Sequence, residues 1–220
     1  MILNIESSTK NCSVSLSNEG AILALKEINN GQFSHSEFLH VFIKELMEDN
    51  AVSFEDLLAV AVSMGPGSYT GLRIGVSAAK GICFSVDCPL IALDSLDVLA
   101  HQAVGKGDVL IPVIDARRDE VYTAIFDKLG KRLGATEALI LTSDSYNAYE
   151  NSKRVFLGDA IDKLGDYLQI KEDDLLINTH PSARELGQLA WHKFQQKDFE
   201  DVAYFEPYYL KDFRVTPSKK

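Results

Sequence analysis

A basic surface is what this chain of 220 residues most clearly lacks, because 22 Lys and Arg are outnumbered by 32 Asp and Glu and the formal net charge is −10. Nucleic-acid binding depends on lysine and arginine contacts with phosphate, so this composition argues against a protein that binds nucleic acid on its own. A basic apolar leader is also absent, and the longest uncharged run, residues 57–72, is interrupted by glycine and proline. We therefore expect a cytoplasmic protein that does not associate with a membrane.

Cysteine is scarce as well. Cys12, Cys83 and Cys88 are an odd number and too few for a disulfide framework, which fits a reducing compartment. Cys83 and Cys88 have no second cysteine pair, so a zinc site of the usual paired spacing is not expected. All three are predicted to be small buried hydrophobic residues.

Two stretches about half a chain apart share one plan. Each begins with a short apolar strand that ends in a carboxylate, Glu6 in the first and Asp115 in the second, and continues through a polar turn into two more strands. Hairpin turns are indicated by Asn18-Glu19-Gly20 and Lys128-Leu129-Gly130. The strands are expected at residues 2–6, 12–16 and 21–28, then at 111–115, at 121–126 and in a segment that reaches residue 141.

After its three strands each half continues, by hydrophobic periodicity, with a helix, a strand and a second helix. These elements are expected at 34–50, 58–63 and 70–85, then at 142–150, 154–157 and 160–168, followed by an apolar segment at 175–178 and a helix at 182–196. Strands beside amphipathic helices predict an α/β fold with parallel members.

A duplicated βββαβα unit is the plan of the actin-like fold, also described as ASKHA or ribonuclease H-like. The N-terminal lobe is expected at 1–106 and the C-terminal lobe at 107–220, with the segment after Phe199 a candidate to pack back on the first lobe. The alternative is an ordinary α/β domain in which two strands end in a carboxylate by chance.

The densest motif is the glycine-rich run at residues 64–75, which leaves a predicted buried strand and enters a helix. Backbone N–H groups at such a junction can bind an anion, yet the run lacks the Walker A, dinucleotide-binding and nucleophile-elbow patterns. A structural turn with Ser68 or Thr70 as the helix N-cap explains it equally well. In the actin-like plan both carboxylate turns face a cleft, and the candidate nucleotide-binding or anion-binding residues are Glu6, Ser7, Gly65, Gly67, Ser68, Thr70, Arg73, Asp115 and Arg117.

Two helices carry more apolar or small surface than one lobe requires. The first, expected to begin with a capping box of Ser34 and Glu37, spreads apolar side chains over about half its circumference, more than the roughly 100° stripe of one buried face. The second, at 70–85, contains several glycines, each costing about 1 kcal/mol relative to alanine in a helix interior. Deep burial of the first helix is the alternative to a partner interface. The candidate partner-binding residues are Phe38, Leu39, Phe42, Ile43, Leu46, Met47, Leu72, Gly75, Val76 and Ala79.

Four segments, in chain order, resemble the bacterial TsaB family, also called YeaZ, and together they span most of the sequence. They are Ile5-Glu6-Ser7-Ser8-Thr9 with Cys12-Ser13-Val14; Gly65-Pro66-Gly67-Ser68-Tyr69-Thr70-Gly71-Leu72-Arg73-Ile74-Gly75; Ile114-Asp115-Ala116-Arg117 with Glu120-Val121-Tyr122; and Glu206-Pro207-Tyr208-Tyr209-Leu210-Lys211.

The resemblance implies an actin-like protein that is not itself the catalyst. Similar proteins form a heterodimer with the catalytic TsaD protein, which transfers a threonylcarbamoyl group to N6 of adenosine 37 in tRNAs that read codons beginning with A, and the TsaE ATPase joins the complex. The resemblance also implies a homodimer through the same helices. Because the surface is acidic, we expect tRNA contact mainly through the partners. No cofactor of its own is expected, and ATP or ADP is a candidate ligand of the complex.

No catalytic residue and no metal ligand are expected. The nearest histidine pair, His35 and His40, is separated by five helical steps, which place the rings about 140° apart and exclude a shared ion on a regular helix. Glu6 stands where the family pattern has aspartate, and the added methylene displaces the carboxylate, which argues against ATP hydrolysis by this chain alone.

Other functions remain open from the sequence. One is an actin-like kinase or glycoprotease-like hydrolase that acts on its own, and another is a scaffold that senses a nucleotide in the cleft. The basic tail is either a local tRNA contact or a solvated terminus, and it consists of Lys211, Arg214, Lys219 and Lys220.

Overall fold

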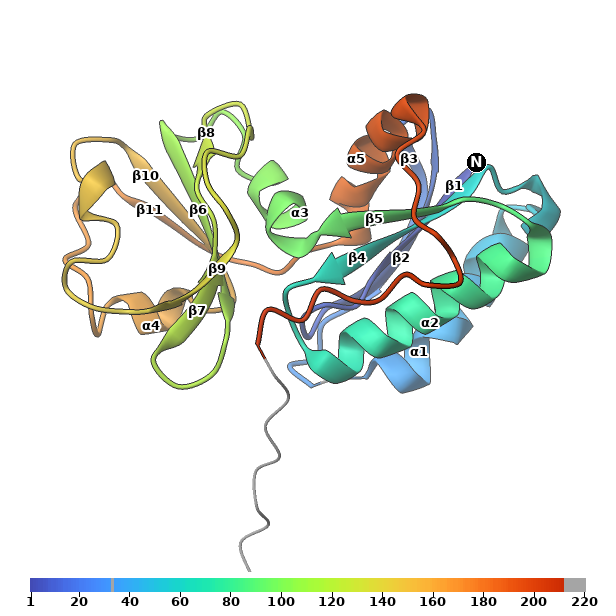
Figure 1. Ribbon diagram of the computed structural model, residues 1–220, viewed down its shortest axis with the longest axis horizontal. Helices are drawn as coiled ribbons and strands as arrows, with labels where there is room; N and C mark the ends of the chain where they lie inside the picture. The colour runs from blue at the N-terminus through green and yellow to red at the C-terminus, as the bar shows by residue number, and fades with distance from the viewer. Residues whose placement is uncertain (33, 212–220) are drawn as a thin grey trace, which may run out of the picture.

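The computed structural model describes residues 1–32 and 34–211, which form two lobes, each built around a mixed β-sheet (Figure 1). The strand order is β3-β2-β1-β4-β5 in the first sheet, and β11-β10-β6-β7-β9 in the second. In both sheets the central strand pairs antiparallel with the next strand in sequence and parallel with a later one. The duplicated plan expected from the sequence is confirmed.

The first half follows the expected element order closely. Its elements are β1 Ile2–Glu6, β2 Cys12–Asn18, β3 Ala21–Ile28, α1 His35–Asp49, a 3-10 turn at Phe54–Asp56, β4 Ala59–Gly65, α2 Tyr69–Val86, β5 Leu90–Asp94 and α3 Ser95–His101. The turn between β2 and β3 places Glu19 and Gly20 at positive φ, as the hairpin signal predicted. The prediction of a capping box at Ser34 is wrong, because the Ser34 side chain makes no cap hydrogen bond and its hydroxyl is buried without a partner.

The second half keeps the strands but shortens the helices. Its elements are β6 Val109–Asp115, β7 Glu120–Thr123, β8 Phe126–Asp127, β9 Glu137–Ile140, a 3-10 turn at Asn147–Tyr149, β10 Arg154–Gly158, α4 Ile161–Leu164, β11 Leu175–Asn178 and α5 Ala183–Gln196. The strand expected at 121–126 is split, and β8 turns back to pair with β6.

The helix expected at 142–150 is wrong, because Tyr146 takes a left-handed conformation (φ 65°) that interrupts a helix. The Tyr146 side chain packs edge-on against Phe156 in the core of the second lobe. The helix expected at 160–168 ends at Leu164, where Gly165 follows and lowers the helix propensity.

Each half contributes a helix to the other lobe. Helices α1 and α2 cover one face of the first sheet, while α5 from the second half covers the opposite face (Figure 1). Helix α3 of the first half packs its Leu96 and Leu99 against the second sheet. The lobes are therefore joined by shared packing as well as by the chain.

The segment after α5 returns along the first lobe. Glu200 forms an antiparallel β-bridge with Leu90, the first residue of β5. The Lys80 ammonium on α2 donates to two carbonyls of the segment, and Tyr208 N–H donates to Met64 O at 2.7 Å. Lys211, the last residue that the structure describes, donates to Ala116 O of the second lobe. Within 1–32 and 34–211, no helix has the length and apolarity needed to cross a bilayer.

Candidate functional site

The glycine-rich run brings α2 into direct contact with the turn between β1 and β2. Ser7 Oγ donates to Gly71 O at 2.9 Å, and Ser68 N–H donates to Ser8 O at 2.6 Å. A Cβ added at Gly75 would lie 2.1 Å from Ser7 Oγ, and one at Gly71 would lie 2.1 Å from Ser7 O. These glycines are therefore required for the close approach of helix and turn.

Ser68 is the residue that caps α2. Its side chain accepts from Gly71 N–H at 3.3 Å, whereas Thr70 lies exposed in the first turn. Ser68 was one of the two caps considered from the sequence, and the structure assigns the role to it. Gly67 packs as closely on Ser8 as Gly71 does on Ser7, and Gly65 lies beside Tyr208 of the C-terminal segment.

Glu6 points into the interior of the first lobe. Its carboxylate accepts from Ser8 N–H at 2.7 Å, from Ser8 Oγ at 2.6 Å and from Ser63 Oγ. Glu6 and Ser7 are both fully buried, and burial raises the pKa of the Glu6 carboxyl although these hydrogen bonds oppose the shift. The hydrogen-bonding capacity of Glu6 is directed to its own lobe.

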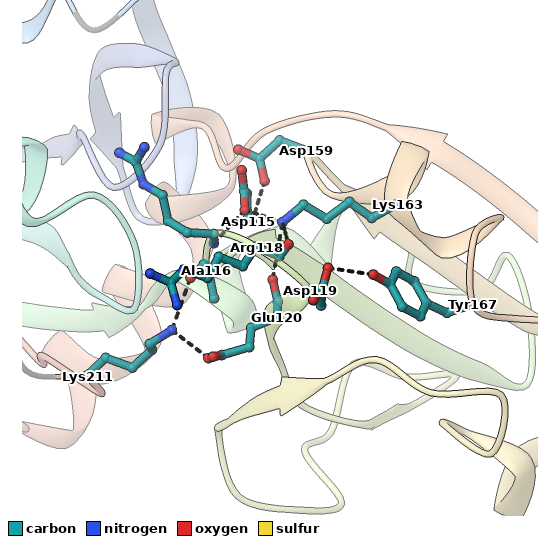
Figure 2. A network of polar contacts seen from close by, with 10 residues as sticks. Asp115, Ala116, Arg118, Asp119, Glu120, Asp159, Lys163, Tyr167 and Lys211 are labelled. Atoms are coloured by element: carbon teal, nitrogen blue, oxygen red, sulfur yellow. Dashed lines mark hydrogen bonds and ion pairs between the residues drawn. The ribbon is translucent and has the colours of Figure 1, made fainter. Parts of the chain in front are cut away.

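The matching turn of the second lobe is exposed instead. Asp115 forms an ion pair with Lys163 at 2.5 Å (Figure 2). It also accepts from Arg117 N–H at 2.7 Å. Burial is the largest single influence and acts to raise the pKa of Asp115, but the bonds from Lys163 and the Arg117 N–H, together with the charges of both side chains, lower the pKa of the carboxyl. Lys211 reaches the same turn through Glu120 and Ala116 O (Figure 2).

The candidate anion-binding residues therefore do not all share one environment. Glu6 and Ser7 are enclosed by the first lobe, whereas Asp115 and Arg117 lie at the surface of the second. Arg73 lies elsewhere, on the outer face of α2, with its guanidinium 4.2 Å from the Tyr69 ring centre and its Nε 3.3 Å from the Tyr209 hydroxyl. Nucleotide binding at these residues stays a prediction.

Helices α1 and α2 each carry exposed apolar side chains. Phe38 and Phe42 are half-buried with ring centres 5.6 Å apart, and Val41 is 45% exposed. Phe84 on α2 is 85% exposed, the largest value among the exposed large hydrophobic residues of the described chain. We use the name outer apolar face for four accessible apolar side chains of the two helices, which are Phe38, Val41 and Phe42 on α1 and Phe84 on α2.

Most of the candidate partner-binding residues lie beneath this face. Those with 3% exposure or less are Leu39, Ile43, Leu46, Met47, Leu72, Val76 and Ala79, and Gly75 is also buried. Deep burial was the alternative considered for α1, and it applies to the side of α1 that faces the sheet. Partner contact stays a prediction for the set, and Phe38 and Phe42 are its members with accessible side chains.

Phe84 and Val41 were missed by reasoning from the sequence. Phe84 follows Arg73, Ser77 and Lys80 at steps of four, three and four, so all four share one face of α2. An aromatic residue on an otherwise polar helical face was the signal available. The same side of α2 borders a groove of about 260 Å³ against the C-terminal segment, lined by Arg73, Val76, Ser77, Lys80, Phe205, Glu206, Pro207 and Tyr209.

The histidines are placed apart. His35 is buried with Nε2 3.4 Å from Asn11 O, while His40 is exposed on the other side of α1. Over the residues with described coordinates, no group of three or more histidine, cysteine or acidic side chains has a metal-binding arrangement. Of the basic tail, Arg214, Lys219 and Lys220 lie outside the described residues.

Comparison with known proteins agrees with this architecture. The family model described as "TsaD: tRNA N6-adenosine threonylcarbamoyltransferase" matches residues 31–215. The Escherichia coli protein named tRNA threonylcarbamoyladenosine biosynthesis protein TsaB is 28% identical over 96% of this chain and 94% of its own length. The Bacillus subtilis protein of the same name is 35% identical over 57% of this chain and 54% of its own length.

Solved structures support the fold. YeaZ from Pseudomonas aeruginosa superposes with a TM-score of 0.80 at 23% identity, covering 95% of this chain and 99% of that one. A second Pseudomonas aeruginosa structure, described as similar to peptidase YEAZ, gives a TM-score of 0.83 at 24% identity over 96% and 99% of the two chains.

The two mixed sheets and their duplicated topology define a protein of the actin-like class. Since the family model covers most of the chain and the Escherichia coli TsaB protein matches the chain over nearly its full length, the chain belongs to the TsaB (YeaZ) family.

Proposed function

We propose that this chain is the noncatalytic subunit of a complex that transfers a threonylcarbamoyl group to N6 of adenosine 37 in tRNAs that read codons beginning with A. In this proposal it pairs with a TsaD-like catalytic subunit through the outer apolar face. The names of the TsaB relatives support the pathway. The observation that carries the pairing is the exposure of Phe84, because an aromatic side chain that is 85% exposed on a rigid helix gains most from burial against a partner.

The packing of the first lobe supports a noncatalytic role. In the actin-like plan the carboxylate at the end of the first strand faces the cleft, where it would position a metal-bound water. Here Glu6 is fully buried, and Ser8 and Ser63 occupy both of its oxygens. A carboxylate held in this way is a structural element of the lobe rather than a base available to a substrate.

The outer apolar face and the net charge of the chain also bear on its other proposed partners. A second copy of the chain would compete for the outer apolar face, so homodimer and heterodimer exclude each other in this proposal. A TsaE-like ATPase joins the heterodimer, and ATP or ADP binds in the complex. With a net charge of −10, the chain leaves most tRNA contact to its partners.

The test is light scattering coupled to size-exclusion chromatography, with the chain alone and mixed with its cognate TsaD-like protein. We expect a 1:1 complex that forms at the expense of the homodimer. Phe84→Glu should weaken the complex by about 2 kcal/mol or more, roughly 30-fold in Kd, because it places a charge in a desolvated interface.

Leu129→Glu is the matched control. Leu129 is 73% exposed in the turn after β8, on the lobe remote from α1 and α2 (Figure 1), so a charge there should leave binding unchanged. Ile43→Glu is unsuitable, because Ile43 is 3% exposed and the substitution would disturb the core. If Phe84→Glu and Leu129→Glu both bound the partner like the unsubstituted chain, the proposed face would be wrong.

A further inference from the structure

Cys83 and Cys88 meet where α2 ends. The helix stops at Val86, Asp87 takes a left-handed conformation with φ 53° and ψ 43°, and Cys88 N–H donates to Cys83 O at 3.2 Å. This bond, from the residue after the left-handed position back to the helix, is the Schellman motif. The side chains of its two end residues pack against each other in that motif.

The two thiols also interact with each other. The Cys83 thiol donates to Pro89 O at 3.5 Å, which places its sulfur at the start of the strand that follows Cys88. The hydrogen-bonding interaction between the two thiols lowers the pKa of Cys88 against the opposing effect of burial, and it raises the pKa of Cys83. The pair is therefore asymmetric, with Cys88 the better thiolate.

Cys88 is also the most exposed of the three cysteines. Cys88 retains 8% of its surface, Cys83 retains 2%, and Cys12 on β2 retains none. The residues just before Cys88 form an exposed turn, so a small oxidant reaches Cys88 first. All three cysteines are free thiols in the described structure.

We propose that Cys83 and Cys88 form a reversible disulfide when the protein meets a hydroperoxide. The Cys88 thiolate attacks one peroxide oxygen, the O–O bond breaks, and the sulfur is oxidised to a sulfenic acid as hydroxide, or the corresponding alkoxide, leaves and is protonated. The Cys83 sulfur then attacks the Cys88 sulfur, the S–S bond forms, and the sulfenic oxygen leaves as water with the Cys83 proton. Hydrogen peroxide is thereby reduced to two water molecules for each disulfide.

The disulfide would close a short loop around Phe84. A link between Cys83 and Cys88 fixes the last turn of α2, which presents Phe84 to solvent. Formation of the bond depends only on the geometry of the two thiols, so it stands whether or not the outer apolar face binds a TsaD-like subunit.

The experiment treats the folded full chain with hydrogen peroxide, denatures it, alkylates all remaining thiols and maps tryptic peptides by mass spectrometry. Both cysteines lie in one peptide, residues 81–106, and Cys12 lies in another, residues 11–26. We expect peptide 81–106 without alkyl groups and lighter by two hydrogen atoms, peptide 11–26 alkylated, and a reductant to restore alkylation of both cysteines.

Variants separate the two steps. Cys83→Ala should leave Cys88 as a sulfenic acid that dimedone traps, Cys88→Ala should leave Cys83 reduced, and the control Cys12→Ala should still form the disulfide. Full alkylation of peptide 81–106 after peroxide treatment of the unsubstituted protein would overturn the proposal. A disulfide that includes Cys12 would overturn it too, and both outcomes are read without any variant.

Discussion

The close contact between α2 and the β1–β2 turn predicts opposite effects for two glycines of the same helix. Gly75 and Gly81 both lie in the interior of α2, so replacement by alanine should gain about 1 kcal/mol of helix propensity at either position. A Cβ at Gly81 meets nothing within 4 Å, whereas a Cβ at Gly75 lies 2.1 Å from Ser7 Oγ and 3.2 Å from Ser7 Cβ. The two substitutions therefore differ only in packing.

The magnitude follows from what must move. Ser7 is fully buried and its hydroxyl donates to Gly71 O, so relief of the clash costs that hydrogen bond, about 1 kcal/mol, together with overpacking of about 1–3 kcal/mol. After the propensity gain, Gly75→Ala should destabilise the protein by about 1–3 kcal/mol. For a chain of this size each kcal/mol shifts Tm by about 2–4 °C.

Thermal unfolding followed by circular dichroism is the assay. Gly81→Ala should raise Tm by about 2–4 °C, and Gly75→Ala should lower it by roughly 2–12 °C. Combining Gly75→Ala with Ser7→Ala removes the clashing hydroxyl, so the cost of Gly75→Ala should be smaller in that background. An equal rise in Tm for both single substitutions would refute the reasoning that these glycines serve the close approach.

Two further predictions concern a buried ion pair and the enclosed turn. Asp174→Asn leaves the Arg154 guanidinium, 3% exposed, without its carboxylate, and should cost about 3–5 kcal/mol in urea unfolding at neutral pH. Burial is the largest single influence and acts to raise the pKa of Asp174, but the bonds from Arg154 and the Lys171 N–H, together with the charges of both side chains, lower the pKa below 3.8. The stabilisation by Asp174 is therefore complete above its unfolded pKa and is lost as pH falls through the lower folded pKa. The difference in free energy of unfolding between the unsubstituted chain and Asp174→Asn should narrow below about pH 4. A difference that stayed unchanged down to about pH 2 would contradict this. Calorimetric titration of the isolated chain with ATP should show no binding, because Glu6 and Ser7 are buried with partners of their own, and a saturable heat for about one site per chain would count against that view.

Local sequence patterns were sufficient for most of the fold. Alternation and hairpin signals located the strands around the turn at Glu19 and Gly20, and 3.6-residue periodicity located α1 and α2 to within a residue or two. The helix expected at 142–150 failed because the left-handed Tyr146 is stabilised by packing on Phe156, a contact that no local pattern reveals.

The sequence by itself determined the duplicated strand plan and most of the helices, because burial periodicity and turn chemistry are properties of neighbouring residues. Only the tertiary structure decided that Glu6 turns inward while Asp115 stays exposed, since the serines that bind Glu6 include Ser63, 57 residues away. It also decided that α5 covers the first sheet and that Phe84, rather than Ile43, faces solvent. Such choices depend on which surfaces distant segments cover, and that is settled when the whole core packs together.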